Sequence, residues 1–520
     1  MTTPPARTST PAEASAPVSV TTRSAGAVVA VVLVAAFMDL VDVTIVAVAA
    51  PDIAASLGAT PAQVQWVVAA YALALGAALI TGGRLGDQLG RRRLFLTGLA
   101  MFVLASAACA LAPSPGWLIA MRVAQGLAAG LMVPQVFGVI RSSLSPAQMG
   151  AALGAYGGVQ GLASIAGPLL GGLLVTWDVL GLGWRAVFWV NVPVGLVALV
   201  VAAKVLPESR QAGAARVDVR GALLLATCLV AVLLPVVQGP AWGWPAWGWL
   251  LVGVGLAGLV GFWHLQRQLA ARGAQPVLDP ALLGSRSFTA GLVASLVFFG
   301  GIASFFLLLS VHLQDGTGRS ALSTGLITLP YALGSMLTSA AGVKLAARHG
   351  RRLLITGSLL IAASHAAMWL LITAVSAPTW WQLGAPLLLG GLGLGLAAPP
   401  LVGVVLAAVP GPAAGAAGGV LSTVNQVGGA LGVAALGTVF FTHLSRASGP
   451  AAETADVQAA ASAEAFAVVL VWQVGLYVLA AALMLLLPAG SGQRTAPDEG
   501  DDHDVALDVI GGQGPQQAHA

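Results

Sequence analysis

Three charged residues lie well inside long apolar segments of this 520-residue chain: Asp39, Asp42 and Arg122. A charge at the centre of a membrane helix costs about 2.5–3.5 kcal/mol on insertion scales, so residues of this kind need a reason to be there. Asp39 and Asp42 are three positions apart and therefore share one face of a helix. Two neighbouring carboxylates repel each other in a medium of low dielectric constant, which allows one of them to bind and release a proton. This is the chemistry that proton coupling requires.

Arg122 keeps its proton in proteins, so its expected role is electrostatic. We expect it to hold Asp42 or Asp39 ionised in one conformation and to release that carboxylate in another. The alternative is structural: the three charges pair with one another, or cap backbone groups, without exchanging a proton. The sequence contains no G-x-x-x-x-G-K-[ST] loop and no cluster of His, Cys and acidic residues. We therefore expect no catalytic residue, no cofactor, no metal site and no enzyme activity.

The composition indicates the class of protein in which Asp39, Asp42 and Arg122 lie. The chain is 58% hydrophobic and 8% charged, with a mean hydropathy of +0.89, whereas soluble domains carry about 25% charged residues. We expect an all-helical integral membrane protein, whose partners are the lipid bilayer, a small-molecule substrate and protons, and not nucleic acid. Apolar windows long enough to span a bilayer predict fourteen helices, at 27–50, 63–83, 94–112, 117–140, 150–175, 185–206, 218–238, 246–267, 288–313, 322–346, 353–375, 381–408, 413–443 and 464–488.

The distribution of basic residues predicts the orientation of these helices. Of the 23 Lys and Arg residues, 19 fall on the side of the N-terminus, three fall on the other side, and Arg122 lies within a helix. Basic residues accumulate in cytoplasmic loops, so both termini are expected in the cytoplasm. Arginine outnumbers lysine 21 to 2, which is typical of a GC-rich bacterial genome and favours a bacterial cytoplasmic membrane.

A repeat divides the chain into two halves. Gly90-Arg91-Arg92 recurs as Gly350-Arg351-Arg352, and GLAAGLMVP at 126 corresponds to GLGLGLAAP at 391. The offset spans eight helices, so two six-helix halves are expected to flank an inserted pair. Paired halves with a site between them are typical of secondary transporters. The predicted regions are a disordered tail at 1–24, the N-terminal half at 25–206, the inserted pair at 207–287, the C-terminal half at 288–488, and a disordered tail at 489–520.

The charged loop GRLGDQLGRRR at 83–93 is a candidate cytoplasmic gate. Gly83 and Gly90 are expected to permit tight turns. We expect Asp87 to pair with Arg91 or Arg92 across helix ends when the cytoplasmic side is closed, and opening to break that pair. The alternative is that the basic residues only set the topology. The second copy of the loop lacks the acid, so the complete gate belongs to the N-terminal half.

Polar residues within other helices are candidates for a substrate cavity. They are Gln125, Gln160, Asn425 and Gln426, with interhelical hydrogen bonding as the alternative. The repeat counterparts of Arg122 and Gln125 are Leu387 and Gly390, so the C-terminal half is expected to supply shape and an apolar wall. Its single histidines, among them His365, are expected to make local hydrogen bonds rather than relay protons.

The chain resembles the major facilitator superfamily, and within it the fourteen-helix drug:proton antiporters, over nearly its whole length. Five motifs carry the resemblance: DVTIVAVAAP at 42–51, GRLGDQLGRR at 83–92, RVAQG at 122–126, GPLLGG at 167–172 and WRAVFWVNVPVG at 184–195. The resemblance implies the major facilitator fold, and proton coupling through the acid of the first helix and the arginine of the fourth. It also implies that Gly167, Pro168, Gly171 and Gly172 form the antiporter motif of the fifth helix.

These observations predict a proton-coupled antiporter that exports amphipathic small molecules, such as drugs or antibiotics, by alternating access. The alternatives are a dedicated exporter of one endogenous metabolite or self-made antibiotic, and a proton-coupled importer. A membrane-embedded enzyme or sensor is a rival of another class, which the absence of a catalytic motif disfavours. Oligomeric state and substrate identity have no signature in the sequence.

Overall fold

The computed structural model describes residues 22–209, 218–274, 276–407, 409, 414–447 and 455–488. The elements within these residues are helical: α1 (Thr22–Leu57), α2 (Pro61–Leu89), α3 (Arg91–Ala110), α4 (Pro115–Ser143), α5 (Pro146–Thr176), η1 (Val179–Gly181), η2 (Gly183–Arg185), α6 (Ala186–Trp189), α7 (Asn191–Val205), α8 (Val219–Trp242), α9 (Ala246–Ala271), α10 (Pro280–Leu283), α11 (Arg286–Val311), η3 (His312–Gly316), α12 (Ala321–His349), α13 (Arg351–Ala374), α14 (Trp380–Ala407), α15 (Ala414–Ala447) and α16 (Ala455–Met484).

Fourteen of the spans in this part of the chain are long and apolar enough to cross a membrane, as predicted. The predicted boundaries were too short in places. Helix α1 continues through Pro51 to Leu57, beyond the expected end at residue 50. It also begins at Thr22, inside the region expected to be a disordered tail, while residues 1–21 and the tail at 489–520 lie outside the described residues.

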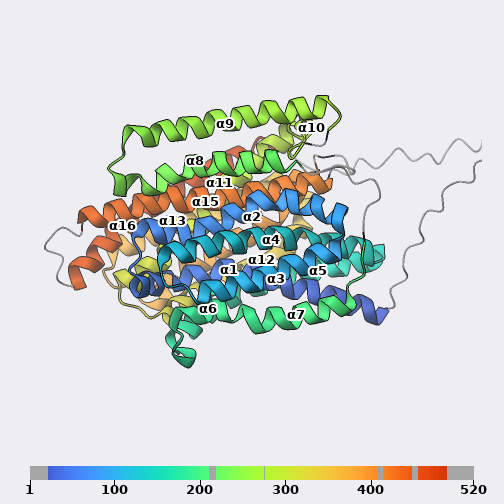
Figure 1. The fold of residues 1–520 in the computed structure, drawn as a ribbon. Helices are drawn as coiled ribbons and strands as arrows, with labels where there is room; N and C mark the ends of the chain where they lie inside the picture. Colours follow the sequence, from blue (N-terminus) through green and yellow to red (C-terminus); the bar gives the residue numbers. More distant parts are fainter. Residues whose placement is uncertain are drawn as a thin grey trace, which may run out of the picture.

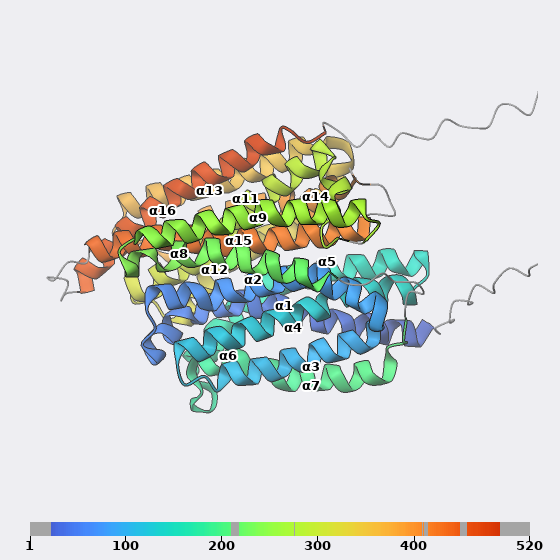
Figure 2. The same ribbon diagram turned by 45° about the horizontal axis from the view of Figure 1, so that its top comes forward.

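The helices run side by side in two groups, α1 to α7 and α11 to α16 (Figure 1). Within the first group α4 packs against α2 and α3, and within the second α14 packs against α12 and α13. We call these groups the N-terminal and C-terminal halves. Helix α1 begins and helix α16 finishes at the same end of the bundle (Figure 2), which we call the terminal end; the other is the opposite end.

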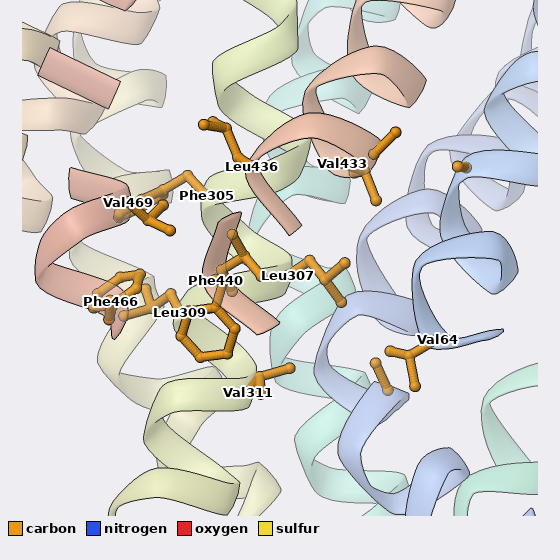
Figure 3. Packing of buried hydrophobic residues seen from close by; sticks show 14 of the residues in the cluster. Val64, Phe305, Leu307, Leu309, Val311, Val433, Leu436, Phe440, Phe466 and Val469 are labelled. Carbon is orange, nitrogen blue, oxygen red and sulfur yellow. The ribbon is translucent and has the colours of Figure 1, made fainter. Parts of the chain in front are cut away.

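The halves meet along two seams, α2 with α15 and α5 with α12, and α1 also packs against α11. An apolar cluster near the opposite end supports the first of these contacts. It includes Val64 of α2, Leu307 of α11 and Val433 of α15, together with side chains of α16 (Figure 3). Because the cluster contains residues of both halves, its burial stabilises their association at that end.

The inserted pair lies over only one of the two seams. Helix α8 packs against both α2 and α15, and α9 packs against α8 as an outer layer (Figure 1). The hydroxyl of Thr438 on α15 donates to the carbonyl of Val236 on α8, at 2.9 Å. The inserted pair therefore contacts both halves where α2 meets α15.

The halves are joined at the opposite end and apart at the terminal end along α5. Near the opposite end, the amide of Leu322 donates to the hydroxyl of Thr176 at 3.0 Å, and Gly172 packs directly against the α12 backbone. A Cβ on Gly161, further along, would lie 3.5 Å from the side chain of Met336 on α12. At Gly158 and Gly154, the next turns of the same face, no atom of the described residues lies within 4 Å of a Cβ position, and both glycines are exposed.

Candidate functional site

Asp42 is the centre of a fully buried hydrogen-bond network inside the N-terminal half. Arg122 donates to its Oδ2 in an ion pair. Gln125 and Asn191 both donate to its Oδ1, at 2.8 and 3.0 Å. The exposed fractions of these four residues are 0 to 3%. A buried charge is tolerated where it is paired and hydrogen-bonded, and this network meets that condition for Asp42.

The guanidinium of Arg122 is likewise surrounded by partners. Its Nε donates to the carbonyl of Val67 at 3.1 Å, and its Nη1 also donates to Gln125 Oε1 at 2.8 Å. Its carbon lies 4.1 Å from the ring centroid of Tyr71, a cation–π arrangement. The prediction that Arg122 pairs with an acid of the first helix is confirmed for Asp42.

Asp39 lies one turn from Asp42 on α1 and has different surroundings. The hydroxyl of Tyr71 donates to its Oδ1. Among the residues that the structure describes, Tyr71 is the one hydrogen-bond donor to this carboxylate, although Arg122 and Asp42 are close enough to act on it electrostatically. Asp39 is buried, with 6% of its surface exposed.

Small residues allow the helices that carry this cluster to approach one another. Gly126 follows Gln125 on α4 and packs directly against the carbonyl of Tyr71 on α2. A Cβ at that position would collide with the α2 backbone, so only glycine fits the contact. The RVAQG sequence therefore combines the arginine, its amide partner and the glycine that brings α4 against α2.

The glycines of the antiporter motif connect α1 with α12. Gly167 packs directly against Thr44 of α1, and a Cβ on Gly171 would lie 3.0 Å from Ile45. Gly172, on another face of α5, packs against Ala321 and Leu322 of α12. Pro168 lies inside the helix. Helix α5 therefore contacts both the acidic helix, two residues from Asp42, and the other half.

The charged loop forms an ion pair, but within one half. Arg91 Nη2 lies 2.8 Å from Asp87 Oδ1, and its Nη1 donates to the carbonyl of Gly138 on α4 at 2.7 Å. Arg92 instead donates to the carbonyl of Ala203 on α7. Asp87 and Arg91 thus pair across the ends of α2 and α3, as expected, and the breaking of this pair on opening stays a prediction. The pair coexists with the separation along α5, because all of its partners belong to the N-terminal half.

Of the two turns expected at glycines of the charged loop, one is absent. Gly90 has a φ of 106°, which residues with a side chain rarely adopt, and it separates α2 from α3. Gly83 instead lies within α2, which continues to Leu89. Its neighbour Gly82 packs against the backbone of Gly130 on α4, and this close contact keeps α2 helical past the expected turn.

The four residues expected in a substrate cavity lie in different places. Gln125 is fully buried and belongs to the Asp42 network. Gln160 is exposed on α5, in the stretch where the halves separate. On α15, Asn425 has a buried Oδ1 without a partner among the described residues, and Gln426 lies against Gly76 of α2 on the seam. These three remain candidates for contact with a substrate.

The fold agrees with comparisons to known proteins. The sequence profile described as Major Facilitator Superfamily matches residues 32–433. The chain belongs to this superfamily. One similar protein, named a probable actinorhodin transporter of Streptomyces coelicolor, is 38% identical over 80% of this chain and 72% of its own length. Another, named a multidrug resistance protein B homolog of Mycobacterium tuberculosis, is 33% identical over 79% of this chain and 75% of its own length.

A solved structure supports the same fold. A D-xylose–proton symporter aligns with a TM-score of 0.62 at 14% identity, covering 90% of this chain and 99% of the symporter. At that identity the likeness concerns the fold alone. Together with the fourteen apolar spans, these matches show a multi-pass membrane transporter of the major facilitator fold.

Two members of the site, Tyr71 and Asn191, were not predicted from the sequence. Asn191 was present in the quoted motif WRAVFWVNVPVG without an assigned partner, and it bonds both Asp42 and Ser106. Tyr71 recurs in the repeat as Tyr331, at the same offset of 260 as the glycine–arginine loop. That recurrence is the signal that could have identified it.

Proposed function

We propose that this protein is a proton-coupled antiporter that exports amphipathic small molecules across the bacterial cytoplasmic membrane by alternating access. The observation that carries the proposal is the buried cluster of Asp39, Asp42 and Arg122. It lies in a transporter whose halves are joined at one end of the seam and apart at the other along α5. A proton that binds this cluster changes its charge where water is excluded, so it can favour one arrangement of the halves.

We infer that the terminal end faces the cytoplasm, because most Lys and Arg residues lie on that side. Both termini are then cytoplasmic, and the conformation is inward-facing. A substrate enters between the halves from the cytoplasm, where Gln160 and the glycines of α5 are exposed. Protons bound on the outside return through the same protein. One charge moving through 100 mV supplies about 2.3 kcal/mol, so a few protons suffice for appreciable uphill export.

Helix α5 is the element that we propose links the two events. It contacts α1 near Asp42 through Gly167 and Gly171, and it contacts α12 of the other half through Gly172. A shift of α1 on protonation therefore reaches the seam through one helix. The Asp87–Arg91 pair fastens α2 and α3 to α4, and we assign it to keeping the cytoplasmic end of the N-terminal half rigid while the halves move.

The proposal can be tested with purified protein in proteoliposomes, using ethidium as a fluorescent cationic probe. An imposed pH gradient should drive accumulation of ethidium against the direction of proton flow, and an uncoupler should abolish it. Arg122→Leu should abolish accumulation, whereas Glu464→Gln, at an exposed acid on α16, should not affect it. Accumulation that survives the uncoupler, or that follows the direction of proton flow, would contradict antiport.

A dedicated exporter is the second candidate, and the relative named a probable actinorhodin transporter favours it. Cells with and without the protein should be compared for growth across a panel of chemically unrelated lipophilic antibiotics. Resistance to several unrelated compounds supports broad export. Resistance confined to one aromatic natural product, with no ethidium transport, supports a dedicated substrate and leaves the antiport mechanism to be measured with that compound.

A further inference from the structure

The two carboxylates of α1 are bound so differently that they cannot exchange a proton with equal ease. Both oxygens of Asp42 are occupied: Arg122 bonds one, and Gln125 and Asn191 bond the other. Asp39 accepts a hydrogen bond only from Tyr71 among the described residues. We propose that Asp39 carries the exchanged proton, while Asp42 stays ionised as the fixed partner of Arg122. This inference rests on the proposed antiport function.

Adding a proton has different consequences at the two sites. A protonated Asp42 would leave the buried guanidinium of Arg122 without its ion-pair partner, and would place a donating hydroxyl where the guanidinium and the amide nitrogens of Gln125 and Asn191 already donate. A protonated Asp39 faces a tyrosine hydroxyl, which can accept a hydrogen bond as well as donate one. The hydroxyl of Tyr71 needs only to rotate. The Asp39 site therefore tolerates both protonation states without leaving a charge unpaired.

The position of Asp39 also favours exchange with the open end. It lies three residues nearer than Asp42 to the start of α1, and so nearer the terminal end. The charged and titratable groups around it are Asp42 on α1, Tyr71 on α2, Arg122 on α4 and Tyr156 on α5. Tyr156 belongs to the turn of α5 between the exposed Gly154 and Gly158. Asp39 thus adjoins the helix that is uncovered where the halves separate.

Tyr71 is placed to transmit the protonation of Asp39. Its hydroxyl contacts Asp39, and its ring lies against Arg122. The net charge of Asp39, Asp42 and Arg122 is −1 when Asp39 is ionised and zero when Asp39 is protonated. Five residues further along α2, the carbonyl of Gly76 accepts a hydrogen bond from Thr423 of α15, at 2.9 Å. Tyr71 is therefore a positioning residue on a helix that packs against α15 of the other half.

Infrared difference spectroscopy of the protein in lipid tests the assignment without a substrate. Spectra recorded between alkaline and acidic pH contain the carbonyl band of each carboxyl group that gains a proton. Subtracting the spectra of a variant from those of the wild type cancels the surface acids and isolates one residue. We expect Asp39→Asn to remove a band and Asp42→Asn to remove none. Tyr71→Phe should shift the frequency of the Asp39 band, because it removes the hydrogen bond to that group.

A band lost in Asp42→Asn and retained in Asp39→Asn would overturn the assignment. If Asp39→Asn does not fold, Asp39→Glu replaces it: the band must move in frequency, and an unchanged band rejects Asp39. Ethidium transport separates this inference from the proposed function. If the pH gradient drives ethidium transport in both the wild type and Asp39→Asn, Asp39 is rejected as the proton carrier and antiport stands. If the pH gradient does not drive ethidium transport in the wild type, antiport is rejected, whichever carboxylate binds the proton.

Discussion

The two halves repeat the same backbone contact but surround it with different chemistry. In the N-terminal half Gly126 of α4 packs against the carbonyl of Tyr71, and in the C-terminal half Gly391 of α14 packs against the carbonyl of Tyr331. Each tyrosine ring then meets a different neighbour. Arg122 lies over Tyr71, whereas Tyr331 is surrounded by aromatic rings, with Phe306 at 5.0 Å between centroids.

This comparison separates the scaffold from the proton chemistry. Leu387, fully buried, occupies the repeat position of Arg122. The C-terminal half is nonetheless not a purely apolar wall, because His365 is buried beside Phe305 and Tyr477, with ring centroids 4.5 and 5.3 Å away. The packing of glycine on tyrosine is thus a structural feature of both halves, while the buried ion pair found among the described residues belongs to the N-terminal half.

The largest effect should follow from giving the N-terminal half the residue of its counterpart. Arg122→Leu leaves Asp42 buried without its partner, which should lower the free energy of unfolding by about 3–5 kcal/mol. Thermal unfolding in detergent would show this as a lower midpoint. The double variant Asp42→Leu/Arg122→Leu should recover most of the loss, because an apolar pair replaces the ion pair. Leu387→Met is the matched control in the other half, and a single variant as stable as this control would contradict the argument.

An intermediate effect should appear at the repeated glycines. Gly126→Ala and Gly391→Ala both force a Cβ against a helix backbone, so each should destabilise its half by about 1–3 kcal/mol. Only Gly126→Ala should also reduce proton-driven ethidium transport per folded molecule, because it moves Arg122 and Tyr71 apart. Transport measured alongside thermal stability distinguishes the two effects. Equal losses of transport in both variants would mean that the halves share the coupling.

Much of this arrangement could be predicted from the sequence because it depends on local properties. Hydropathy and length define the membrane helices, and the cost of a buried charge identifies Asp39, Asp42 and Arg122. An ion pair between Arg122 and an acid of α1 follows from charge alone, whereas the choice of Asp42 over Asp39 does not. The position of the inserted pair over the α2–α15 seam does not, because α8 is apolar on several faces and its sequence specifies no partner.

The finer structure of the site depends on contacts between distant segments. In the sequence Tyr71 is indistinguishable from the other apolar residues of α2, and only the fold places its hydroxyl against Asp39 of α1. Asn191 lies 149 residues from Asp42, the carboxylate to which it donates. The turn predicted at Gly83 is absent for a related reason: close packing of α2 on α4 overrides the local preference of glycine for a turn. The histidine prediction was wrong at His365, whose two ring nitrogens have no hydrogen-bond partner among the described residues.

The smallest effect is expected at His365 of the C-terminal half, compared with the polar residue Asn191 of the N-terminal half. Asn191→Leu removes a donor from a buried carboxylate and should cost about 1–3 kcal/mol. His365→Phe removes a group whose nitrogens are already unpartnered and keeps a ring beside Phe305, so the free energy of unfolding should change by less than about 1 kcal/mol. Chemical or thermal unfolding of both variants in the same detergent makes the comparison. A loss at His365 as large as that at Asn191 would show that the histidine is hydrogen-bonded in the membrane, and that the C-terminal half holds a polar site of its own.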